Sequence, residues 1–196
     1  MIIDSLLYAF AYLTGSLSSA IILCKLAGLP DPREQGSGNP GATNVLRFGG
    51  KKLATAVLLG DVLKGVIPVV LAVMLDVSIT VIALVGLCAF LGHLYPIFFG
   101  FRGGKGVATA LGVMFGFNWT IAILVIAIWI LISLVFRLSS LAALCAAAAA
   151  PLISWLLHAD NNITLSITVM SALLIARHHS NIRKLLAGTE PKIGKK

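Results

Sequence analysis

Long apolar runs separated by short polar connections are the feature that most constrains how this sequence folds. The hydrocarbon core of a bilayer is about 30 Å thick, so a helix needs about 20 apolar residues to cross it. The chain has 196 residues, of which 59% are hydrophobic and only 11% are charged, whereas soluble domains are about half apolar and about a quarter charged. Seven runs are candidate spans: 3–28, 53–75, 77–99, 105–117, 119–136, 139–158 and 162–177. We therefore predict an all-α, polytopic membrane protein with a single domain over residues 1–196.

The number of spans depends on the short fourth run, because one helix over 105–136 would give six spans instead of seven. Nearly all lysines and arginines fall into four groups, at 25–52, 102–105, 137 and 177–196. Seven spans place these groups on one side of the membrane, and the positive-inside rule makes that side cytoplasmic. We therefore predict seven transmembrane helices with the N-terminus outside and the C-terminus cytoplasmic. The net charge of +8 then forms a rim that contacts anionic membrane lipid, and nothing in the sequence indicates nucleic acid.

A polar, glycine-rich loop with the sequence GSGNPGATN follows the first run and begins at Gly36. Small residues let a backbone curl so that several N–H groups face one point, which is how many proteins bind phosphate. Arg47 follows and can clamp an oxyanion with two hydrogen bonds. The loop also matches the dinucleotide fingerprint, but the predicted transmembrane helix before it, in place of a strand, disfavours that interpretation; a flexible linker remains the alternative. The predicted phosphate ligands are Ser37, Gly38, Asn39, Gly41, Thr43 and Asn44.

Two further polar clusters are predicted to lie on the same membrane face. The first contains Arg102, Gly103, Gly104 and Lys105, and the second contains His178, His179, Asn181 and Glu190. The first lacks the glycine and hydroxyl residues that a P-loop requires, and it can also be a cationic interfacial loop. The paired histidines can also complement a helix dipole. Three distant polar segments on one face nevertheless predict one binding site, for which adjacent histidines without cysteines do not suggest zinc.

Two smaller features lie within or beside the spans. Asp61 and Lys64 are three residues apart and share a helix face, and such intramembrane charges are either a structural pair or functional. Of Ser139 and Ser140, one is expected to cap the following helix while the other, Ser140, reaches the substrate. The three cysteines lie in apolar runs and read as helix-packing residues.

The sequence resembles the bacterial acyl-phosphate-dependent glycerol-3-phosphate acyltransferases, an integral membrane family. Three blocks carry the resemblance: 36–47, 92–106, and 179–183 with Glu190. It implies transfer of a fatty acyl group from acyl phosphate to glycerol 3-phosphate, giving lysophosphatidic acid and phosphate, as the first membrane step of phospholipid synthesis. It also implies no metal and no cofactor, a multi-pass protein of the bacterial inner membrane with a cytoplasmic active site, and the soluble enzyme that makes acyl phosphate as a partner.

The resemblance also suggests how the site residues divide their roles. Lys105 and Arg47 neutralise the leaving phosphate, while His179 and Asn181 position glycerol 3-phosphate. The general base is either His179 or an oxygen of the donor phosphate, and the 36–44 loop binds either the donor or the acceptor phosphate. The remaining predicted ligands are Ser37, Gly38, Asn39, Gly41, Thr43, Asn44, Arg102, Gly103, Gly104, Ser140, His178 and Glu190. A phosphate-ester transporter with the same anion clamps is a rival, although the sequence has no inverted repeat.

Overall fold

A computed structural model describes residues 1–193, and this part of the chain contains helices but no strand. The helices are α1 (Ile2–Gly15), α2 (Ser19–Leu26), α3 (Ala42–Phe48), α4 (Gly50–Met74), α5 (Ile79–Leu94), a 3-10 turn η1 (Ile97–Phe99), α6 (Val107–Phe117), α7 (Trp119–Phe136), α8 (Ser139–Leu156), α9 (Asn161–Arg177) and α10 (His179–Leu186). The predicted all-α class is therefore confirmed.

Four of these segments are long and apolar enough to cross a bilayer: Gly50–Met74, Ile79–Phe99, Trp119–Phe136 and Ser139–Leu156. The predicted run 3–28 is not one straight helix. It breaks after Gly15, and α1 and α2 meet at 46° and together qualify as a fifth span. The side chain of Ser18 accepts a hydrogen bond from the Ile21 amide and so begins α2 as a new helix. The predicted count of seven crossings remains a prediction.

Residues 105–136 form two helices, as the seven-run interpretation requires. The break lies at Asn118, whose Oδ1 accepts hydrogen bonds from the amides of Thr120 at 2.8 Å and Ile121 at 3.4 Å. This is the ordinary arrangement of a residue that caps a helix N-terminus. The short helix α6 packs so closely on α4 that a Cβ at Gly112 would overlap the carbonyl of Val62. Small residues permit such close backbone contact between membrane helices.

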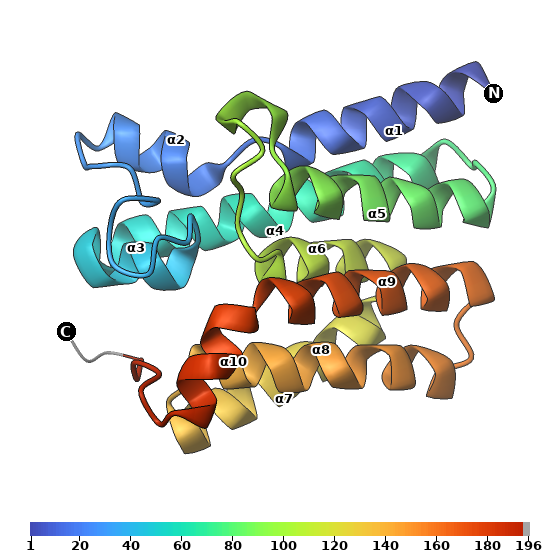
Figure 1. The fold of residues 1–196 in the computed structure, drawn as a ribbon. Helices are drawn as coiled ribbons and strands as arrows, with labels where there is room; N and C mark the ends of the chain where they lie inside the picture. The colour runs from blue at the N-terminus through green and yellow to red at the C-terminus, as the bar shows by residue number, and fades with distance from the viewer. Residues whose placement is uncertain (194–196) are drawn as a thin grey trace.

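The arrangement of the helices collects the polar connections at one end of the bundle (Figure 1). The 27–41 segment, the loop before α6 and helix α10 lie toward the left of that view, while the α4–α5 and α8–α9 turns lie at the right with the N-terminus. Contacts join the segments at the left end. Thr43 meets Ser139, Arg177 donates to the carbonyl of Gly103, and the amide of Ile193 donates to the carbonyl of Arg137. The basic groups of the sequence therefore share one end of the molecule.

Candidate active site

The glycine-rich loop is organised around the side chain of Asn44, which is only 2% exposed. Its Oδ1 accepts a hydrogen bond from the Ser37 amide at 2.9 Å, and its Nδ2 donates to the carbonyls of Pro32 and Gln35, each at 2.9 Å. Gly36 adopts a left-handed conformation with φ of +56°, and a Cβ there would overlap Asn44 Oδ1. The amide of Asn44 therefore holds the shape of the loop.

The other predicted ligands of this loop lie nearer the surface. Ser37 and Gly38 are exposed, and Asn39 and Gly41 are half-buried just before α3. The hydroxyl of Thr43 lies 3.3 Å from that of Ser139 and so links the loop to the start of α8. Arg47 is half-buried on α3. Backbone and side-chain polar groups of the loop thus remain available to a ligand at the polar end of the bundle.

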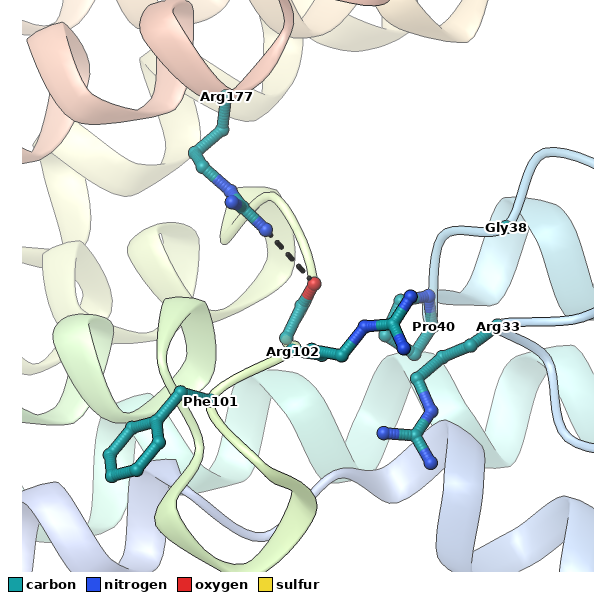
Figure 2. A pocket seen from close by; sticks show the side chains of 7 residues that line it. Arg33, Gly38, Pro40, Phe101, Arg102 and Arg177 are labelled. Atoms are coloured by element: carbon teal, nitrogen blue, oxygen red, sulfur yellow. Dashed lines mark hydrogen bonds between the residues drawn. The ribbon is translucent and has the colours of Figure 1, made fainter.

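A pocket of about 280 Å³ lies beside this loop and carries three guanidinium groups (Figure 2). Its lining residues are Arg33, Gly38, Pro40, Phe101, Arg102, Gly103 and Arg177. The side chain of Arg102 extends toward Pro40, and Phe101 lies on the other side of the loop backbone. Three arginines around one small pocket favour an anionic ligand such as a phosphate.

Two of these arginines are held in place by neighbouring groups. Arg33 binds both carboxylate oxygens of Asp31, at 2.7–3.1 Å, and also donates to the carbonyl of Phe99 at 3.0 Å. These hydrogen bonds lower the pKa of the Asp31 carboxyl, so the pair is charged at neutral pH. Arg177 donates to the carbonyls of Gly103 and Gly104 at 3.1 and 3.3 Å, and its guanidinium lies 5.7 Å from the ring centre of Tyr95. The pocket is therefore preorganised.

A second cationic centre surrounds Lys105, which is joined to three distant segments by a hydrogen-bond network. Lys105 Nζ donates to Asn181 Oδ1, and Asn181 Nδ2 donates to Glu190 Oε1 at 2.7 Å. The same Glu190 oxygen accepts from Ser140 Oγ at 2.6 Å, while Glu190 Oε2 is buried and has no hydrogen-bond partner among the described residues. Four predicted site residues therefore meet directly.

The charge environment of Lys105 ties this network to the other predicted cations. Burial lowers the pKa of its ammonium, and the positive charges of Lys184, Arg177 and Arg47 lower it further, while Glu190 acts in the opposite direction. These charged residues come from α3, the 100–106 loop, the end of α9, α10 and the segment after α10. The end of the bundle is thus a concentrated positive site, in which Glu190 supplies one counter-charge.

The two adjacent histidines lie in different environments. His178 is 3% exposed, and its Nδ1 lies 2.8 Å from the carbonyl of Leu174. Because a carbonyl only accepts, Nδ1 carries the hydrogen and Nε2 of the neutral ring is an acceptor. Burial and the nearby charge of Lys105 together lower the pKa of His178 to about 4, against the opposing effects of the backbone hydrogen bond to Leu174 and the charge of Glu190. His179 is exposed, and its Nδ1 lies 3.3 Å from the carbonyl of Ala176 in the preceding turn. His178 is therefore the histidine that adjoins the Lys105 network.

Comparison with known proteins identifies the family. The sequence model described as "Glycerol-3-phosphate acyltransferase" matches residues 5–188. A glycerol-3-phosphate acyltransferase of Methylococcus capsulatus is 51% identical over 196 residues, covering 100% of this chain and 99% of the relative. One from Hydrogenovibrio crunogenus is 57% identical over 188 residues, covering 95% and 90%. The chain belongs to the glycerol-3-phosphate acyltransferase family. The predicted class of enzyme, a membrane acyltransferase, is confirmed.

Solved structures also resemble this acyltransferase over nearly its whole length. A crystal structure of PlsY, an integral membrane glycerol 3-phosphate acyltransferase in its glycerol 3-phosphate form, has a TM-score of 0.94 and 43% identity, covering 97% of this chain and 96% of that one. The lysophosphatidic acid form of PlsY has a TM-score of 0.92 and 42% identity, covering 97% and 95%. The acyltransferase therefore has the integral membrane fold of these proteins.

Sequence reasoning did not select two arginines that line the pocket of this acyltransferase, Arg33 and Arg177. Arg33 belongs to the predicted basic group at 25–52, and its carboxylate partner stands two residues earlier, a spacing that signals a local ion pair. Arg177 directly precedes the predicted cluster at His178. Their positions in the basic groups were visible in the sequence, but their meeting across one pocket depends on how the segments pack.

Three of the predicted ligands, Asn44, Gly103 and Gly104, make contacts that hold the loops themselves in shape. Asn44 uses its amide to hold its own loop, and the carbonyls of Gly103 and Gly104 accept from Arg177. Gly104 also donates its amide to the carbonyl of His93 at 3.2 Å. Among the described residues, no group of three or more histidine, cysteine and acidic side chains is arranged to hold a metal ion.

Proposed function

We propose that the acyltransferase takes its acyl group from acyl phosphate and transfers it to glycerol 3-phosphate, releasing lysophosphatidic acid and phosphate. The observation that supports this most directly is the meeting of Lys105, Asn181, Glu190 and Ser140 beside a pocket lined by three arginines. Both substrates carry a phosphate, so the reaction requires a site with enough positive charge for two anions. The long acyl chain of the donor and product explains why such a site lies at the end of a membrane bundle.

In this proposal, the two phosphates divide the polar residues between them. The 36–44 loop, Arg47 and Lys105 hold the donor phosphate and neutralise it as it leaves. The remaining network places glycerol 3-phosphate through Asn181 and Ser140, with Glu190 orienting both of these side chains. The loop binds through polar groups of the exposed Ser37, Gly38 and Thr43 and of the half-buried Asn39 and Gly41. In the second segment Arg102 supplies a further cation, while Gly103 and Gly104 hold Arg177 through their carbonyls.

The imidazole role predicted for His179 is better served by His178, because His178 is buried and close enough to Lys105 and Glu190 for their charges to act on it, whereas His179 is exposed. Its free Nε2 can accept a hydrogen bond from a hydroxyl of glycerol 3-phosphate. A ring with a pKa near 4 is a weak base, whereas the second ionisation of a phosphate monoester has a pKa of about 6. We therefore assign His178 the positioning of the hydroxyl and the donor phosphate the acceptance of its proton. His179 remains the alternative base and is tested separately below.

The transfer then proceeds in one displacement at the acyl carbonyl. The primary hydroxyl oxygen of glycerol 3-phosphate forms a bond to the carbonyl carbon, and the bond from that carbon to the phosphate oxygen breaks. The hydroxyl proton leaves with the phosphate, so charge and atoms balance without a cofactor. Fixed cations near the carbonyl stabilise the negative charge that develops on its oxygen. We assign this second role to the guanidinium of Arg47 and the ammonium of Lys105, which also neutralise the leaving phosphate.

The decisive experiment supplies the purified protein in lipid nanodiscs with palmitoyl phosphate and radiolabelled glycerol 3-phosphate, and measures lysophosphatidic acid. We expect product from palmitoyl phosphate and none from palmitoyl coenzyme A, because a phosphate-sized cationic site does not match a thiolate leaving group with its nucleotide arm. Lys105→Met is the matched control and should lose most of the activity. Product from palmitoyl coenzyme A alone would refute the proposed donor.

We further propose that the protein crosses the bacterial inner membrane seven times, with the N-terminus outside and the site in the cytoplasm. There it can receive acyl phosphate from the soluble enzyme that makes it. Single cysteines at the exposed positions Ser37 and Ser180, in a variant without the three native cysteines, should react only from the cytoplasmic side. A cysteine at exposed Asn161, beside the α8–α9 turn, should react only from outside. Labelling of Ser37 and Ser180 positions from opposite sides would refute this topology.

A further inference from the structure

A buried polar cluster that takes no part in the proposed chemistry lies directly behind the Lys105 loop. It contains Asp61 and Lys64 of α4, His93 of α5 and Thr109 of α6, and none of the four is more than 7% exposed. Lys64 Nζ lies 3.0 Å from Asp61 Oδ1 and donates to the carbonyl of Leu17 at the α1–α2 break, at 2.8 Å. The cluster thus connects three helices, α4, α5 and α6, with the break between α1 and α2.

His93 is the member that faces the active-site loop. Its Nδ1 lies 3.1 Å from Thr109 Oγ1 and 3.9 Å from Asp61 Oδ1. The opposite ring atom, Nε2, lies so close to Gly104 that a Cβ there would overlap it. The backbone carbonyl of His93 also accepts the amide of Gly104. A turn of the imidazole ring would therefore displace the backbone immediately before Lys105.

The orientation of the ring depends on Thr109, which is itself fixed in place. Its carbonyl lies where a Cβ of Gly65 would be, so α4 and α6 touch through their backbones at this point. Its side chain is fully buried, with an exposed fraction of 0%. Without the hydroxyl, His93 Nδ1 would have no hydrogen-bond partner in the described structure, and a buried polar atom in that state is unfavourable.

We propose that Asp61, Lys64, His93 and Thr109 are positioning residues, which hold the 103–105 loop so that the ammonium of Lys105 meets Asn181 and the donor phosphate. A buried ion pair is by itself weak evidence for stability, because desolvation offsets much of its attraction. Because this cluster contacts the active-site loop through His93, we assign it to holding the shape of that loop. This inference rests on the role of Lys105 in the proposed function.

The test compares side chains at Thr109 by hydroxyl and by volume. If the hydroxyl holds His93, Thr109→Ser should keep kcat within about threefold, while Thr109→Val and Thr109→Ala should both lose about 10- to 100-fold, the cost of misplacing a catalytic group. If Thr109 only fills space, Val should be the best substitute and Ser should resemble Ala. Equal kcat for Ser and Ala would overturn the proposal, and this pair remains informative even if the Val variant fails to fold.

Two controls separate this inference from the proposed function. Ser154→Ala removes another fully buried hydroxyl, paired with Thr164 near the opposite end of the bundle, and should leave kcat unchanged. In the double variant Thr109→Ala/Lys105→Met, kcat should fall less than about threefold below that of Lys105→Met alone. The effects of two residues that act through the same group are not additive. Full activity of Lys105→Met would refute the role of Lys105 in the proposed function. A full additional loss in the double variant would refute only the positioning role.

Discussion

Replacing Asn44 by aspartate tests the central hydrogen bonds of the glycine-rich loop. The change is nearly isosteric, but it replaces the amide that donates to the carbonyls of Pro32 and Gln35 with an oxygen that cannot donate. A hydrogen bond contributes about 1 kcal/mol net. Loss of these two bonds, with repulsion between the new oxygen and two carbonyls 2.9 Å away, should destabilise the loop by about 3 kcal/mol. That free energy corresponds to a factor of about 100 in the population of the ordered loop.

The assay is hydrogen exchange at the Ser37 amide, which Asn44 Oδ1 protects at 2.9 Å, together with acyl transfer. We expect exchange in Asn44→Asp to be up to about 100-fold faster, and transfer to fall with it. Gln35→Ala is the matched control, because it keeps the backbone carbonyl that Asn44 contacts and should leave exchange unchanged. Wild-type exchange at Ser37 in Asn44→Asp would refute the scaffolding role. Wild-type exchange combined with a higher KM would instead support the direct ligand role predicted from the sequence.

Substitutions at four further positions test the charged site and its two histidines. Arg47→Ala should lower acyl transfer by roughly 30-fold or more, because an unpaired charge of a desolvated pair costs about 2–5 kcal/mol, and Arg47→Lys should rescue little since an ammonium lacks the bidentate fork; normal turnover would remove Arg47 from the site. His178→Ala should lower kcat/KM for glycerol 3-phosphate at least about tenfold and His179→Ala less than about threefold, whereas the reverse order would restore His179 as the base. Burial lowers the pKa of Lys105, so its ammonium should lose its proton at a pH below the ordinary lysine pKa. The kcat/KM of the enzyme should fall as the pH rises through that value, and Lys105→Arg should move this alkaline fall to higher pH. An alkaline limb that stays in place in Lys105→Arg would show that another group titrates there.

The membrane architecture follows from local properties of the sequence. Apolar length and the turn at Asn118 separate the helices, because hydropathy and helix capping act over a few residues. The basic residues mark one end of each hairpin of helices, which is why three polar clusters could be expected to meet. The break after Gly15 is not predicted, since residues 3–28 form one mostly apolar run and the capping role of Ser18 is a weak signal within it.

The tertiary structure decided which side chains within those clusters face one another. Adjacent His178 and His179 look equivalent in the sequence, but the packing of α9 buries the first beside Lys105 and leaves the second exposed. The amide of Asn44 matches the pattern of a phosphate ligand, yet its partners are carbonyls of its own loop. Arg33 and Arg177 are 144 positions apart (177 minus 33) but line one pocket. Such contacts depend on the angles and rotations at which helices pack, which local hydropathy and spacing do not specify.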